Sequence, residues 1–61
     1  MEELEGIGEI IVQKLKIEKK VTVKDMATYL NLSEDIVLDA VDELAEKGLV
    51  FQPEEGIIAL V

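Results

Sequence analysis

Residues 22–50 of this 61-residue chain read TVKDMATYLNLSEDIVLDAVDELAEKGLV, and this stretch decides the fold. Apolar residues recur at helical spacing on both sides of residues 31–33, which predicts two short amphipathic helices joined by a three-residue turn. Gly48 supplies a stop, because glycine readily takes the left-handed conformation that follows a helix C-terminus. We therefore expect helices over about 23–30 and 34–47, followed by a strand.

Each of these helices has residues suited to its ends. The hydroxyl of Thr22 can accept a hydrogen bond from the backbone N–H of Asp25, whose side chain can answer in a variant of the capping box. Ser33 caps the second helix in the same way. Asn31 tolerates the left-handed conformation better than most non-glycine residues. After the glycine stop, Leu49 is expected to fold back onto the second helix as in a Schellman motif.

The second helix has two contrasting faces. One face is an apolar arc centred on residues 37, 40, 41 and 44, with Leu38 at its edge. The other face is acidic and comprises Glu34, Asp35, Asp39, Asp42, Glu43 and Glu46. The acidic residues of the first turn are favoured there by the helix dipole. The whole acidic face is expected to be solvated.

A further helix is predicted over residues 2–17, with Leu4, Ile7, Ile11 and Leu15 on one stripe. Gly6 and Gly8 weaken this helix, each by roughly 1 kcal/mol relative to alanine. Two explanations stay open. The glycines either allow another backbone to approach closely or mark a frayed start, with the firm helix beginning near Gly8.

The remaining segments predict β-structure. Val21 is expected to begin a very short strand, and residues 49–52 and 57–61 to form a hairpin around a turn at 53–56. The return strand is apolar on both faces, which a strand with one solvated face would not be. Its second face either meets a partner, through Ile57, Ala59 and Val61, or is covered by the first helix or the chain end.

The pattern resembles the winged helix-turn-helix domain found in many bacterial and archaeal regulators. The resemblance rests on Met26-Ala27, Leu30-Asn31-Leu32-Ser33, Val37, Val41, Leu44 and Gly48-Leu49-Val50, and with the hairpin it covers nearly the whole chain. It implies one α+β domain over residues 1–61, with a three-helix core and a short C-terminal β-hairpin wing. In such domains the short strand commonly pairs with the wing. The expected core comprises Ile7, Ile11, Leu15, Met26, Leu30, Leu32, Val37, Val41, Leu44, Leu49 and Ile58.

The composition limits the classes of function that we expect. The chain has no histidine and no cysteine, so the commonest general base and nucleophile are missing, and we expect neither an enzyme nor a cofactor, metal or small-molecule site. It has no run of 18 apolar residues and no signal-peptide pattern, so we expect a cytoplasmic protein without membrane contact. The net charge is −8, with six lysines and no arginine, and arginine is the commonest reader of guanine.

Two functional hypotheses follow. The first is a protein-interaction module, acting as a dimerisation unit or an adaptor, with contacts at Leu38 and the return strand and an acidic rim that suits a basic partner. The second is DNA binding in transcription regulation, with the second helix of the turn unit in the major groove. The acidic face of that helix disfavours DNA binding, because DNA carries one negative charge per roughly 1.7 Å. The candidate basic contact patch lies elsewhere and comprises Lys14, Lys16, Lys19, Lys20 and Lys24.

Overall fold

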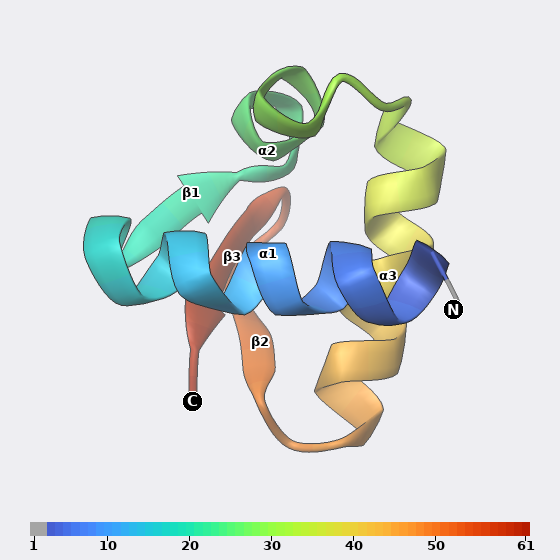
Figure 1. Ribbon diagram of the computed structural model, residues 1–61. Helices are drawn as coiled ribbons and strands as arrows, with labels where there is room; N and C mark the ends of the chain where they lie inside the picture. The colour runs from blue at the N-terminus through green and yellow to red at the C-terminus, as the bar shows by residue number, and fades with distance from the viewer. Residues whose placement is uncertain (1–2) are drawn as a thin grey trace.

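The computed structural model describes the backbone of residues 3–61 and the side chains from Gly6 onward. Its elements are α1 (Glu3–Glu18), β1 (Lys20–Thr22), α2 (Val23–Leu30), α3 (Glu34–Glu46), β2 (Val50–Glu54) and β3 (Ile57–Leu60). This is the α+β order that the sequence predicts, with three helices and one antiparallel sheet in the described part of the chain (Figure 1). The expected start of α1 at residue 2 lies outside the described residues.

Both helices of the turn unit begin at the predicted caps. The Thr22 hydroxyl accepts a hydrogen bond from the Asp25 backbone N–H at 2.9 Å, and the Ser33 hydroxyl accepts one from the Ile36 N–H at 3.3 Å. Both capping residues have extended backbone angles, as N-caps do. These bonds satisfy backbone donors that have no partner within the helix, and they set where α2 and α3 begin.

Both helices also end in the same way. Asn31 follows α2 with a φ of 61°, and the Leu32 N–H returns to the Ala27 carbonyl at 2.9 Å. Gly48 follows α3 with a φ of 78°, and the Leu49 N–H returns to the Leu44 carbonyl at 3.0 Å. Each is the backbone pattern of a Schellman motif. The left-handed conformation suited to Asn31 and Gly48 is confirmed at both residues, and the predicted Schellman motif is confirmed at Gly48.

The sheet has the order β1-β3-β2, so the last strand lies in the middle. The expected pairing of the short strand with the hairpin is confirmed, with Val21 opposite Ile58. The return strand of a C-terminal hairpin would be an outer strand with unpaired backbone groups if it paired with β2 alone, but β3 pairs with β1 on one side and β2 on the other. The free edges belong to β1 and β2.

Strand β2 is longer than expected and includes Pro53, which the sequence places in the turn. Its register with β3 is irregular between Phe51 and Glu54. Proline is tolerated here because β2 is an edge strand and Pro53 lies within this irregular part of the register. The turn is correspondingly tighter, with Gly56 at a φ of 82° and its N–H donating to the Gln52 side chain at 3.3 Å.

The core lies between the sheet and the three helices. Seven of the eleven expected core residues are buried: Ile11, Leu15, Met26, Val37, Val41, Leu44 and Ile58. Ile7, Leu30 and Leu32 are partly buried and pack against them. Leu49 is wrong as a core residue, because its side chain is 45% exposed although its backbone closes the α3 C-terminus. Six residues are buried in addition to the expected core: Val21, Val23, Ala27, Ala40, Val50 and Ala59.

The two glycines of α1 differ. A Cβ added at Gly6 would meet nothing within 4 Å, whereas one added at Gly8 would lie 3.3 Å from Cδ2 of Leu44. Gly8 therefore allows a close approach, but by an α3 side chain and not by another backbone. The alternative of a helix that begins near Gly8 after a frayed start is not observed, because α1 is helical from Glu3. Residues 1–2 and the side chain of Leu4 lie outside the described residues.

Candidate interaction surfaces

The acidic face of α3 is fully presented to solvent. All six of its carboxylate residues are exposed: Glu34, Asp35, Asp39, Asp42, Glu43 and Glu46. Among the side chains described, none of them forms an ion pair with a lysine. Leu38 lies beside this face and is 36% exposed. The acidic face of α3 is therefore a negatively charged surface that no described lysine neutralises through an ion pair, and Leu38 lies at its edge.

The basic patch is distributed around the corner where α1, β1 and α2 meet. Lys16, Lys19, Lys20 and Lys24 are exposed there. Lys14 is engaged instead, because its Nζ lies 3.4 Å from Oε2 of Glu18 and 4.2 Å from the centre of the Tyr29 ring. The cation–π contact joins α1 to α2. The patch therefore presents fewer free cations than the sequence suggests.

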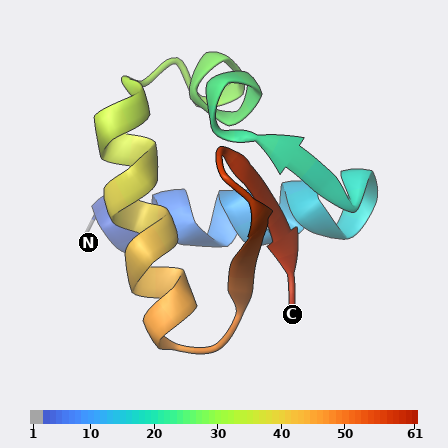
Figure 2. The ribbon, with the colours of Figure 1, turned by 180° about the vertical axis from the view of Figure 1, so that it is seen from behind.

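The outer face of the sheet is the side that α1 does not cover, and Figure 2 views the sheet from that side. Residues directly opposite one another in antiparallel strands share a face. One row across this face is Lys20, Ala59 and Phe51, and the next is Thr22, Ile57 and Glu54. The face thus carries one lysine and one glutamate around apolar side chains, without the charge excess of α3.

The proposed contact residues on β3 differ in accessibility. Val61 is 81% exposed and Ile57 is half-buried, so both can be reached. Ala59 is only 7% exposed. The reason is its central position, since the small alanine is flanked in register by the larger side chains of Lys20 and Phe51. Ala59 is therefore a poor contact residue.

Phe51 is an accessible aromatic residue of the sheet that the sequence did not predict as a contact residue. Its side chain is 46% exposed beside Ala59. Successive side chains of a strand point to opposite faces. Val50 is buried, so the side chain of Phe51 lies on the opposite, outer face. With Phe51 included, we define the outer sheet face as Phe51, Ile57, Ala59 and Val61.

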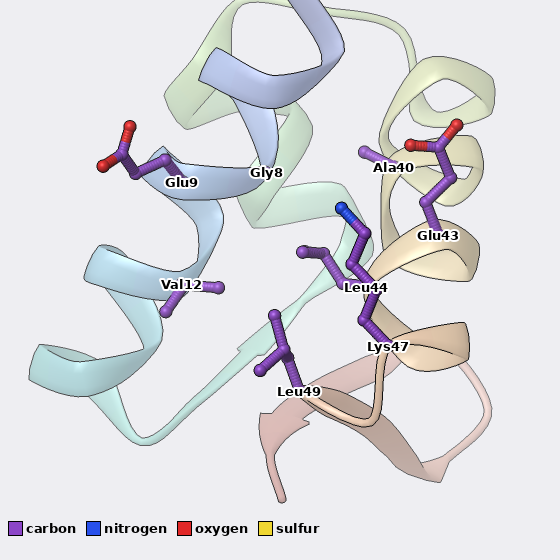
Figure 3. Close-up of a pocket in the computed structure, with 8 residues that line it drawn as sticks. All are labelled: Gly8, Glu9, Val12, Ala40, Glu43, Leu44, Lys47 and Leu49. Atoms are coloured by element: carbon purple, nitrogen blue, oxygen red, sulfur yellow. The ribbon is translucent and has the colours of Figure 1, made fainter.

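A groove runs between α1 and α3. It has a volume of about 350 Å³ and is lined by Gly8, Glu9, Val12, Ala40, Glu43, Leu44, Lys47 and Leu49. In Figure 3, Glu9 and Glu43 stand on its two sides, and Lys47 extends from α3 toward the space between the helices. The floor is apolar and the rim is charged.

In the described residues, no group of three or more carboxylate, histidine or cysteine side chains is placed to hold a metal ion. None of the described helices combines the length and the apolar character needed to cross a membrane. The surfaces above are therefore the candidates that the structure offers.

Comparison with known proteins gave no match: no family model fits the chain, and no similar curated protein or solved structure was found. Function must therefore be inferred from the surfaces of the molecule, and the resemblance to winged helix-turn-helix domains stays a prediction.

Proposed function

We propose that this chain is a protein-interaction domain of the winged helix-turn-helix type, which binds a second protein chain through the outer sheet face. The observation that carries the proposal is the exposed apolar surface of that face, where Phe51 is 46% and Val61 is 81% exposed. Exposed aromatic side chains are enriched at protein interfaces and often carry much of their binding energy. The partner is either another copy of the chain or a different protein.

The charge distribution supports this surface over α3. Lys20 and Glu54 lie beside the outer sheet face, and their opposite charges cancel. A second chain can therefore approach this face without strong repulsion. The acidic face of α3 would repel another acidic chain at short range. Contact through the sheet should be mostly apolar, and salt should therefore weaken it little.

DNA binding is the alternative, and the exposed carboxylates weigh against it. If α3 entered the major groove, its six unpaired carboxylates would meet the phosphate backbone without compensating cations. The candidate basic patch lies at the α1–β1–α2 corner, and Lys14 there is already paired. Any DNA contact would have to use that corner.

The direct test is sedimentation of the purified domain over a concentration series. We expect the average mass of the wild type to rise with concentration, and the double variant Phe51→Ser, Val61→Ser to remain monomeric. Ile17→Ser is the control, because Ile17 is an apolar residue about as exposed as Val61 and lies on α1, outside the outer sheet face. Thermal melts should place all three proteins close together, since the replaced side chains are already exposed.

A mobility shift with unspecific duplex DNA separates the two functions. We expect no shift at moderate salt. A wild type that stays monomeric at high concentration removes the self-association branch and leaves a different protein as partner. A monomer that also shifts DNA, and loses the shift in Lys20→Glu or Lys24→Glu, overturns the proposal in favour of DNA binding.

A further inference from the structure

The groove between α1 and α3 has an apolar floor. Gly8 and Val12 on α1 face Ala40 and Leu44 on α3, and Leu49 closes one end. The groove exists partly because residue 8 is glycine, since a Cβ there would press on Leu44 from 3.3 Å. A volume of about 350 Å³ is sufficient for one or two large apolar side chains. Leu49 leaves part of its surface exposed at this site.

The surroundings of the floor are mainly acidic. Glu9 on α1 and Glu43 on α3 stand on the two sides, and Lys47 is the single cation in the described lining (Figure 3). Asp39 and Glu46 lie four and three residues from Glu43 along α3, on neighbouring positions of the helix surface, and are also exposed. An occupant of the groove therefore meets an excess of negative charge as soon as it extends beyond the floor.

We propose that this groove binds a basic amphipathic helix of a partner protein, which inserts one or two large apolar side chains and lays its lysines or arginines along the acidic rim. Charge complementarity selects this occupant. A second copy of the chain is disfavoured, because each copy carries a net charge of −8 and would bring a like-charged α3 against the rim. The groove lining shares no residue with the outer sheet face, although the Leu49 carbonyl accepts a hydrogen bond from the Val61 N–H. This inference therefore goes beyond the proposed function and is tested separately.

The mode of binding follows from these two features. Apolar anchors spaced by three or four residues on a helix fit a hydrophobic groove, and the opposite charges steer the approach. The aliphatic part of Lys47 can pack over the inserted side chain while its amine turns to solvent or to a neighbouring carboxylate. Binding should weaken as salt rises, in contrast to the apolar contact proposed for the sheet.

The test uses three fluorescent synthetic helical peptides of about 14 residues, or roughly four turns. The first has lysines on one face and two leucines four residues apart on the other. The second replaces both leucines with alanine, and the third replaces the lysines with glutamate. By fluorescence anisotropy with the whole domain, we expect the first peptide to bind with a Kd on the order of 10–100 μM. Each of the other two should bind at least about tenfold more weakly.

Matched protein variants locate the peptide. Leu49→Ser and Glu43→Lys should each weaken binding of the first peptide by about fivefold or more. Asp42→Lys is the control for Glu43→Lys, because it makes the same change of charge at an exposed neighbour that does not line the groove. Phe51→Ser is the control for the sheet. Both controls should bind nearly as well as the wild type.

Several results would overturn the inference. Equal weakening by Asp42→Lys and Glu43→Lys, or equal binding of the alanine peptide, would show that the peptide is held by unspecific charge attraction. Loss of binding in Phe51→Ser would place the peptide on the sheet. A wild type that self-associates and becomes monomeric in Leu49→Ser would make a second copy the occupant. Absence of binding by the first peptide at millimolar concentration also rejects the proposal, and leaves the sheet interaction to its own test.

Discussion

The turn unit and the sheet differ in how directly their structure follows from neighbouring residues. In the turn unit, α2 and α3 begin at Thr22 and Ser33 and end at the left-handed Asn31 and Gly48. The hydrogen bonds that begin and end each helix join residues only a few positions apart in the sequence. In the sheet, the position of β3 depends on β1, which lies more than thirty residues earlier. The difference shows that end signals define helices locally, whereas a strand's neighbours are decided by the whole fold.

The largest expected effect tests the turn unit. Val41 is almost fully buried in the centre of α3, so Val41→Asp would bury an unpaired carboxylate and should unfold the domain. A domain of this size has a total stability of only about 3–9 kcal/mol, by the usual value per residue. Circular dichroism melts are the measurement.

Leu38→Asp is the matched control in the same helix. Leu38 is partly exposed beside the acidic face, and the fold should stay nearly intact after the same replacement. If Leu38→Asp proves the more damaging variant, the orientation of α3 described above is wrong.

The next effect tests the sheet. Ile58 is fully buried on the inner face of the central strand, and Ile58→Ala should lower the free energy of unfolding by about 2–5 kcal/mol. Ile57→Ala, one residue away on the half-buried outer face, should cost clearly less. Urea denaturation compares the two variants. Equal losses would contradict the assignment of inner and outer faces.

The smallest effect tests the contact between α1 and α3. Gly6→Ala should raise the free energy of unfolding by up to about 1 kcal/mol, because alanine favours a helix and the added Cβ meets nothing. Gly8→Ala should gain less or lose stability, because its Cβ lies 3.3 Å from Leu44. Chemical denaturation of both variants is sensitive enough. A larger gain at Gly8 would show that Leu44 moves freely.

The sequence predicted the element order, both caps, both left-handed helix ends and seven buried core positions, because caps and helical periodicity are local properties. It misplaced Leu49, since a residue can end a helix through its backbone while its side chain stays partly exposed. It misjudged Ala59 and missed Phe51 for a single reason. Their exposure depends on which residues of β1 and β2 lie opposite them, and register is a property of the assembled sheet.

The groove could not be anticipated either. Its residues come from α1, α3 and the segment that follows α3, and none of them forms a motif in the sequence. Glu9, Glu43 and Lys47 are ordinary solvated residues when each helix is considered alone. Only the crossing of α1 over α3 places them around one apolar floor (Figure 1).

The central position of β3 also has a consequence for the order of events during synthesis. Strands β1 and β2 are not neighbours, so neither can pair until Ile57–Leu60 has emerged from the ribosome. The helices of the turn unit can form earlier, because their bonds are local. The apolar sides of these helical segments should therefore stay uncovered on the nascent chain until β3 inserts and pairs with both β1 and β2.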